Sequence, residues 1–270
     1  MVLTMTDRVS IAGLSPALPR AALITGAAKR LGRAMAEDLA RAGFAVAVHY
    51  NTSAGAAKEV ARAIATRGGK AVAFKADLAK ENEVKTLVAR ATKALGPLGV
   101  LVNNASTFER DDALGATRAS WDLHIEPNLR APFVLSQDFA RQLPTRAEGV
   151  IVNLLDERVF SLTPHFISYT VSKYALWGLT QTLALALAPR IRVVGIGPGP
   201  TLPSPRQTQA QFRRQFEAMP LGRGASPAEI CAALRFLIGA RAMTGQMIAV
   251  DGGQHLAWSQ VPKGETGLEE

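Results

Sequence analysis

Cysteine is almost absent from the 270-residue sequence, which contains only Cys231. No internal disulfide can therefore form, and a reducing compartment such as the cytoplasm is expected. Apolar runs of about eighteen residues without a charge are also absent, so we expect no membrane span. Residues 1–19 lack the layout of a signal peptide, because their apolar stretch is short and is broken by Asp7, Arg8 and Pro16.

Metal-ligand spacing is missing as well, because the four histidines are scattered along the chain. No metal site is predicted. The chain has 31 basic and 22 acidic residues, a net charge of +9. This excess is compatible with a solvated arginine-rich surface, with attraction of an anionic ligand, or with nucleic-acid binding. The basic residues are dispersed and no motif combines them with aromatic residues, which disfavours nucleic acid.

A large buried core is expected, because 48% of the residues are hydrophobic and 20% are charged. Short apolar runs alternate with segments of helical spacing. Seven of these runs are predicted strands: 21–26, 44–50, 71–78, 98–105, 149–156, 191–199 and 245–253. Strands that are apolar on both faces indicate a parallel sheet with helices on both sides. We predict one α/β domain over 20–258, a Rossmann-like doubly wound parallel sheet, with a loose extension over 1–19 and a polar tail over 259–270.

A glycine-containing turn links the first predicted strand to the first predicted helix. This segment, TGAAKRLG, spans residues 25–32. Gly26 would form the tight turn, Gly32 would allow close packing, and the helix N-terminus would offer its amides to a phosphate. The three-glycine fingerprint is incomplete, because Arg30 stands where the middle glycine is expected. The position between strand and helix still predicts a dinucleotide site.

The end of the second predicted strand indicates which dinucleotide binds. It reads HYNTS over 49–53 and contains no acidic residue. A carboxylate there would hold the ribose 2′-hydroxyl of NADH and would repel a 2′-phosphate. Lys29 and Arg30 add positive charge, and Asn51, Thr52 and Ser53 can donate hydrogen bonds. The sequence therefore predicts NADPH in preference to NADH.

A tyrosine and a lysine four residues apart indicate the chemistry. Tyr169 and Lys173 would share one helix face. A neighbouring ammonium favours the phenolate, so the pKa of Tyr169 is expected to be lowered toward neutral pH, where a general acid is most effective. Asp156 precedes this pair by thirteen residues.

Four segments in this order and spacing, TGAAKRLG, NNAS (103–106), YTVSK (169–173) and PGP (198–200), resemble the short-chain dehydrogenase/reductase superfamily. HY after the second strand, NNASTF, and Asp156 resemble more narrowly the pteridine reductases and bacterial dihydromonapterin reductases. The resemblance implies Tyr169 as proton donor, Lys173 on the nicotinamide ribose, and Asn128 holding a relay water. It also implies a homotetramer in the cytoplasm that acts on a small pterin-like molecule.

The resemblance further assigns ligand contacts. Phe108 would stack on the pterin, Ser106 and Arg30 would contact pterin and phosphates, and Asp156 and Tyr169 would complete the substrate site. The cofactor would contact Gly26, Lys29, Arg30, Leu31, Gly32, His49, Tyr50, Asn51, Thr52, Ser53, Asp77, Leu78, Asn103, Asn104, Ala105, Ser106, Lys173, Pro198 and Gly199. The loop over 201–219 matches no substrate contact.

Asp156 separates the possible substrates, because most members of the superfamily have serine there. An ionised carboxylate only accepts hydrogen bonds, and it would repel the charge that develops on a ketone oxygen. A substrate with N–H donors and a C=N bond, such as a dihydropterin or a dihydrofolate-like compound, is therefore expected. Two alternatives stay open: a reductase of ketones or 3-oxoacyl thioesters, and a non-catalytic NADPH-binding sensor or scaffold.

Overall fold

A seven-stranded parallel sheet forms the centre of the protein in the computed structural model, which describes residues 9–204 and 206–256. The strand order is β3-β2-β1-β4-β5-β6-β7. The strands are β1 (Ala21–Ile24), β2 (Ala45–Tyr50), β3 (Ala71–Lys75), β4 (Val100–Asn103), β5 (Gly149–Leu154), β6 (Ile191–Pro198) and β7 (Met247–Val250). The predicted doubly wound fold is confirmed, and the carboxyl ends of all strands meet at one edge.

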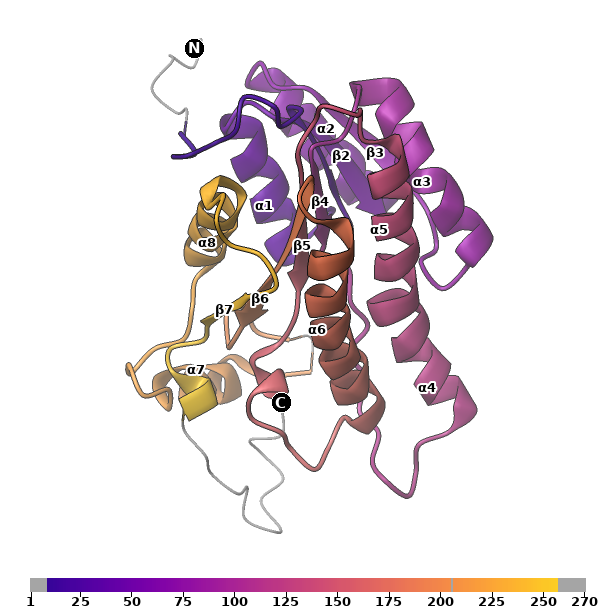
Figure 1. The fold of residues 1–270 in the computed structure, drawn as a ribbon. Helices are drawn as coiled ribbons and strands as arrows, with labels where there is room; N and C mark the ends of the chain where they lie inside the picture. The colour runs from indigo at the N-terminus through magenta and orange to yellow at the C-terminus, as the bar shows by residue number, and fades with distance from the viewer. Residues whose placement is uncertain (1–8, 205, 257–270) are drawn as a thin grey trace.

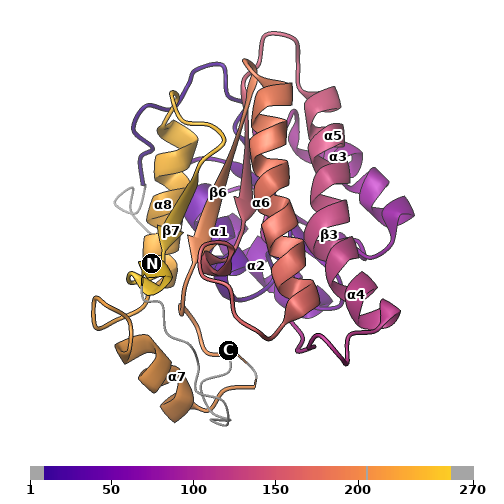
Figure 2. The ribbon, with the colours of Figure 1, turned by 60° about the horizontal axis from the view of Figure 1, so that its bottom comes forward.

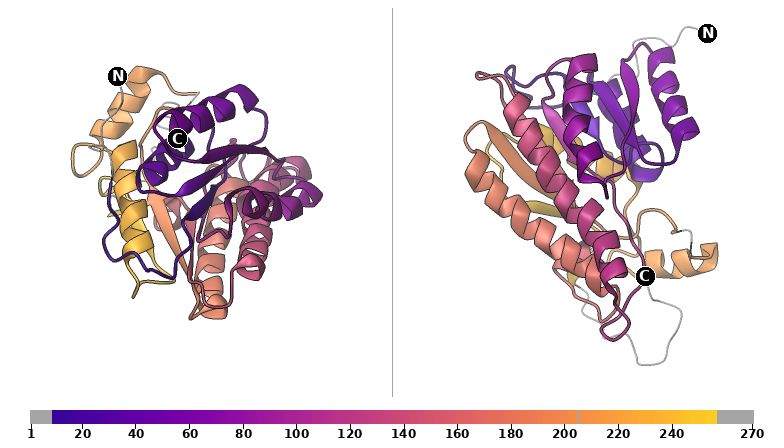
Figure 3. Two further views of the ribbon diagram at one scale, coloured as in Figure 1. Left: turned by 90° about the horizontal axis from the view of Figure 1, so that it is seen from above. Right: turned by 90° about the vertical axis from the view of Figure 1, so that its right-hand side faces the viewer.

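Two layers of helices cover the two faces of the sheet (Figures 1 and 3). The first layer consists of α1 (Arg30–Arg41), α2 (Ala54–Thr66) and α8 (Pro227–Gly239); the second consists of α3 (Glu81–Leu95), α5 (Ala131–Gln142) and α6 (Ile167–Leu187). Strand side chains alternate between the layers. Ala22 and Ile24 of β1 pack in the first core, whereas Ala21 and Leu23 pack in the second.

Residues 121–143, whose apolar positions have helical spacing in the sequence, do not form one continuous α-helix in the structure. The segment forms α4 (Arg118–Ile125), a π-helical turn over Glu126–Arg130 and α5. Pro127 lies in that turn, where it cannot donate an i→i−4 hydrogen bond. Wide turns of this kind often occur at functional sites, and this one carries Asn128.

Two segments outside the sheet differ from expectation. Ile11 and Leu14 pack against the first core and Leu18 is buried, so the described part of the predicted loose extension is docked. The loop after β6 contains a further helix, α7 (Gln209–Glu217), which Figure 2 shows apart from the two helical layers. The predicted tail over 259–270 lies outside the described residues. Among the described residues, no helix is long and apolar enough to cross a membrane.

Candidate active site

The turn between β1 and α1 has the geometry of a phosphate-binding loop. Gly26 has φ +63°, and a Cβ on Gly32 would overlap the Gly26 carbonyl oxygen and the Asn104 side chain. Arg30, in place of the middle glycine, also has a positive φ of 52° and begins α1. The turn and the first residues of α1 line the cavity described below, and Lys29 and Arg30 are exposed beside them.

His49 supports this turn from inside the protein and does not contact the pocket. Its side chain is buried at 1% exposure. Nδ1 accepts the Gly26 N–H at 3.0 Å, which leaves Nε2 to donate to the Ala76 carbonyl oxygen, also at 3.0 Å. Burial lowers the pKa of His49 to about 4, so the ring is neutral at pH 7. Because both ring nitrogens are occupied, the His49 side chain acts on the nucleotide turn through Gly26 and has no ring nitrogen left for a hydrogen bond to a cofactor.

The remaining residues predicted for the adenosine side lie at or just after the carboxyl ends of β2, β3 and β4, and none of them lines the pocket. Asn51 and Thr52 are exposed after β2, and Asn51 Nδ2 donates to Asp77 Oδ1 at 3.4 Å. Three predicted side chains lie beneath the surface or at its edge: Leu78 is in the second core, Asn103 donates to Asn153 Oδ1 at 2.8 Å, and Tyr50 packs on the first core. Ser53 is half-buried at the start of α2.

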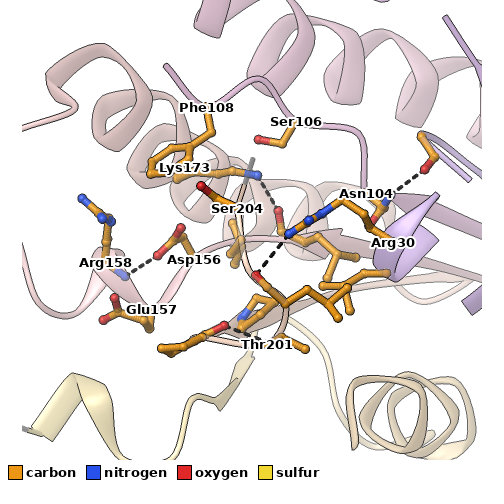
Figure 4. A pocket seen from close by; sticks show the side chains of 18 of the residues that line it. Arg30, Asn104, Ser106, Phe108, Asp156, Glu157, Arg158, Lys173, Thr201 and Ser204 are labelled. Carbon is orange, nitrogen blue, oxygen red and sulfur yellow. Dashed lines mark hydrogen bonds between the residues drawn. The ribbon is translucent and has the colours of Figure 1, made fainter. Parts of the chain in front are cut away.

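A pocket of about 470 Å³ opens at the carboxyl edge of the sheet (Figure 4). It brings together fourteen of the predicted residues: Gly26, Lys29, Arg30, Leu31, Gly32, Asn104, Ala105, Ser106, Phe108, Asp156, Tyr169, Lys173, Pro198 and Gly199. The nucleotide turn therefore lies in the same cavity as the predicted proton donor. A volume of this size suits a small organic ligand.

Asp156 and Tyr169 are directly hydrogen-bonded. The Tyr169 hydroxyl donates to Asp156 Oδ2 at 2.5 Å, and Asp156 Oδ1 accepts the Arg158 backbone N–H at 3.0 Å. Burial, together with the Asp156 charge, raises the pKa of Tyr169 well above 10. The predicted lowering of this pKa by Lys173 is thus wrong for the structure described, and Tyr169 is held as a neutral phenol.

Lys173 is buried behind Tyr169. Its ammonium donates to the Leu154 carbonyl oxygen at 2.8 Å and lies 5.8 Å from the centre of the Tyr169 ring. Burial lowers its pKa from 10.5 to about 8, against the opposing effect of Asp156. The i,i+4 spacing on α6 therefore places the cation beside the phenol, as the sequence pattern predicted.

Asn128 is outside the pocket wall but is held rigidly near Tyr169. Its Oδ1 accepts the Thr107 N–H at 2.8 Å, and its Nδ2 donates to the Thr107 carbonyl oxygen at 2.9 Å and to Ser172 Oγ at 3.1 Å. The π-helical turn thus connects the segment that carries Phe108 to α6.

Phe108 belongs to an aromatic cluster at the pocket. Its ring stacks on Phe166 with a centroid distance of 4.5 Å and meets Tyr169 edge-on at 4.5 Å. The Arg206 guanidinium lies 5.1 Å from the Phe108 ring centre and donates to the Phe108 carbonyl oxygen. The predicted stacking residue is therefore placed beside the proton donor.

Sequence reasoning missed seven polar residues of the pocket wall: Glu157, Arg158, Thr201, Ser204, Gln207, Gln215 and Gln254. Four of them belong to the loop over 201–219, for which no substrate contact was predicted. Burial, followed by repulsion from Asp156, raises the pKa of Glu157 to about 8. Its Oε2 is buried without a hydrogen-bond partner. The proximity of Glu157 and Arg158 to Asp156 in sequence was the available signal.

Comparison with known proteins agrees with this geometry. Residues 20–214 match the family model described as short chain dehydrogenase. The chain belongs to this family. Among curated proteins, a 3-oxoacyl-[acyl-carrier-protein] reductase FabG of Staphylococcus epidermidis is 31% identical over 242 residues, covering 88% of this chain and 99% of the relative. Membership confirms the predicted superfamily and its class, oxidoreductase.

Solved structures give a more specific likeness. FolM alternative dihydrofolate reductase 1 from Brucella canis, complexed with NADP, is 45% identical with a TM-score of 0.88, covering 93% of this chain and all of that one (100%). The corresponding Brucella suis protein, also with NADP, is 46% identical with a TM-score of 0.87, covering 92% and 99%. The angucycline C-6 ketoreductase LanV with bound NADP is 32% identical with a TM-score of 0.83, covering 93% and 100%. These structures support the predicted resemblance to the pteridine reductases.

Proposed function

We propose that this oxidoreductase reduces a C=N bond of a dihydropterin or dihydrofolate-like substrate with NADPH. The observation that carries the proposal is the Asp156 carboxylate, which accepts the Tyr169 hydroxyl at 2.5 Å in the pocket wall. A carboxylate at this place can accept N–H groups of a reduced pterin, but it offers no donor to a ketone oxygen. The likeness to the Brucella FolM structures at 45% and 46% identity supports the same substrate class.

The residues present fit NADPH. The glycine turn leaves space for a phosphate at the start of α1, and the strand end at 49–53 carries no acid to repel a 2′-phosphate. Lys29 and Arg30 would neutralise phosphate charge, and Pro198 and Gly199 would support the nicotinamide side. When bound, this cofactor supplies a hydride from C4 of its nicotinamide.

Residues of the protein supply the proton that accompanies the hydride. Tyr169 is held as a neutral phenol and can donate its proton to the nitrogen of the C=N bond. Asp156, on binding substrate, exchanges its bond with Tyr169 for substrate N–H donors. Lys173 stabilises the phenolate left after donation, because its ammonium lies beside the ring. Asn128, fixed by three hydrogen bonds, would hold the relay water that returns a proton.

Reduction of ketones or 3-oxoacyl thioesters is the second candidate, favoured by the 31% identity to the Staphylococcus epidermidis reductase. A panel containing a dihydropterin, dihydrofolate, a ketone and a 3-oxoacyl thioester, followed by loss of NADPH absorbance, separates the candidates. We expect the two pterins to be reduced and the carbonyl compounds to react at least about 10-fold more slowly, the scale of a lost hydrogen bond to a charged group. Faster reduction of a carbonyl compound would reject the pterin proposal. Binding of NADPH without turnover of any substrate would instead favour a non-catalytic NADPH-binding sensor or scaffold.

Activity should fall as the pH rises past about 8, where Lys173 loses its proton. Its pKa is lowered, so the cation that stabilises the phenolate exists below that pH and disappears above it. Glu157, flanked by Asp156, Arg158 and Asp251, also has a pKa of about 8. The Glu157→Gln variant removes this second titration. A kcat/KM profile that stays level above pH 8 in Glu157→Gln would contradict the role of Lys173.

We also propose a homotetramer in the cytoplasm. Apolar side chains are exposed on α6, where Tyr174 is 54% and Leu185 84% exposed, and Phe236 of α8 is 56% exposed. The two helices cover opposite faces of the sheet, so their exposed apolar groups provide two separate candidate interfaces, as a tetramer requires. Sedimentation equilibrium checks the mass, and cell fractionation checks the location; a monomer or a membrane-bound pool would contradict the proposal.

A further inference from the structure

Arg158 is a buried cation whose hydrogen-bonding capacity is largely unused. The residue is only 7% exposed, and it lines the pocket. The one hydrogen bond of its guanidinium runs from Nη1 to Thr163 Oγ1, at 2.9 Å. No carboxylate of the described residues lies within ion-pair distance, 4.0 Å, of this guanidinium. Because buried charges are normally paired, an unpaired guanidinium in a pocket wall points to a ligand.

The surroundings of Arg158 hold its side chain in place without neutralising it. Its guanidinium carbon lies 5.0 Å from the Phe166 ring centre and 5.5 Å from that of Phe108. Such cation–π contacts orient the group but cancel little of its charge. Glu157 next to it is protonated at pH 7, since burial raises its pKa to about 8. Asp156 uses its two oxygens for the Tyr169 hydroxyl and the Arg158 backbone N–H.

The position of Arg158 defines which part of a ligand it would meet. Figure 4 shows Arg158 with Asp156 and Glu157 at one end of the pocket, with Arg30 of the nucleotide turn at the other. Arg206, whose guanidinium lies 5.1 Å from the centre of the Phe108 ring, is paired with Glu109 at 2.7 Å, so its charge is already compensated. The end of the pocket away from the nucleotide turn therefore presents the Arg158 guanidinium, with which no carboxylate of the described residues is paired, beside two aromatic rings. This arrangement suits an anionic group attached to an aromatic ligand.

We propose that Arg158 binds a carboxylate on the side chain of the substrate, beyond the ring held by Asp156 and Tyr169. This inference rests on the proposed function and adds the substrate class: reduced pterins with a carboxylate-bearing substituent, in preference to those with a neutral one. Nε and Nη2 have no partner within the part of the chain that the structure describes, so the edge of the guanidinium can donate two parallel hydrogen bonds to a carboxylate. Thr163 and the two phenylalanine rings hold the group ready for that contact.

The test compares dihydrofolate, which carries carboxylates, with a dihydropterin whose side chain is uncharged. Arg158→Met removes the charge and keeps the length of the side chain. We expect it to lower kcat/KM for dihydrofolate about 10- to 100-fold more than for the uncharged dihydropterin, the scale of a lost charged hydrogen bond. Arg158→Lys should lose less kcat/KM for dihydrofolate than Arg158→Met, because lysine keeps the positive charge but lacks the planar guanidinium edge that donates two parallel hydrogen bonds. Arg62 is an exposed arginine of α2, so Arg62→Met is the matched charge control. It should leave kcat/KM unchanged for both substrates.

A second measurement needs no variant. An aminobenzoyl-glutamate fragment should inhibit the wild-type enzyme competitively against dihydrofolate and should inhibit more weakly at high salt. Equal losses for both substrates in Arg158→Met, together with no inhibition by the fragment, would overturn the inference and assign Arg158 to the aromatic cluster. If the wild-type enzyme reduces neither substrate, the proposed function itself fails, which is a distinguishable result.

Discussion

Tyr169→Phe should lower kcat for the pterin substrate by about 10²- to 10⁴-fold, the usual contribution of a positioned general acid. The variant removes only the hydroxyl that donates to Asp156 Oδ2. The ring can keep its edge contact with Phe108, whose centroid is 4.5 Å away, so binding of the substrate should change much less than kcat. Steady-state kinetics with NADPH in excess measure this split.

Tyr174→Phe provides the matched control for that variant. Tyr174 is on the same helix, α6, but is 54% exposed and is not part of the pocket wall. Its loss of a hydroxyl should leave kcat unchanged. A Tyr169→Phe enzyme that retained more than about a tenth of the wild-type kcat would show that another group supplies the proton.

Asp156→Ser should reduce pterin turnover by about 10²-fold and should increase reduction of a ketone. Serine replaces an acceptor-only carboxylate with a hydroxyl that can donate to a carbonyl oxygen. The fold around it should survive, because Asp156 caps the short 3-10 helix over Glu157–Val159 through the Arg158 N–H, and serine is also a good N-cap. The ratio of pterin to ketone turnover is the measured quantity.

Asp112→Ser tests whether the loss comes from capping rather than chemistry. Asp112 also accepts backbone N–H groups, those of Leu114 and Gly115, but it is outside the pocket wall. Its replacement should leave the turnover of both the pterin and the ketone unchanged. Thermal unfolding checks the stability of each variant. Intact pterin turnover in Asp156→Ser would remove the main support for a C=N substrate and return the enzyme to general carbonyl reduction.

The fold and the position of the site were predictable because each depends on local pattern. Apolar runs separated by helical spacing predicted the parallel sheet, and the sheet has the seven strands expected. The turn over 25–32 and the pair Tyr169 and Lys173 were recognisable because their spacing places them on a helix start and on one helix face. Since carboxyl ends of parallel strands share one edge, these motifs had to meet there.

Contacts between distant segments could not be predicted in the same way. His49 was expected to contact the cofactor, yet its side chain is buried. Its Nδ1 accepts the N–H of Gly26, which follows the neighbouring strand β1. Arg158 was not singled out from the sequence, yet its guanidinium lies over the rings of Phe108 and Phe166, which come from two other segments. In both cases the sequence indicates the residue type, whereas its neighbours depend on how the elements pack.

The proton donor Tyr169 also combines features that the sequence pattern predicts with features that depend on packing. The sequence by itself determined that a phenol and an ammonium would stand close together, because their i,i+4 spacing puts them on one helix face. The place of the Asp156 carboxylate beside them was implied by the resemblance to the pteridine reductases. Only the tertiary structure decided that the carboxylate accepts the Tyr169 hydroxyl and that burial raises the pKa of Tyr169 rather than lowering it. The physical reason is that a pKa depends on desolvation and on distances between charges, and both are properties of the packed protein.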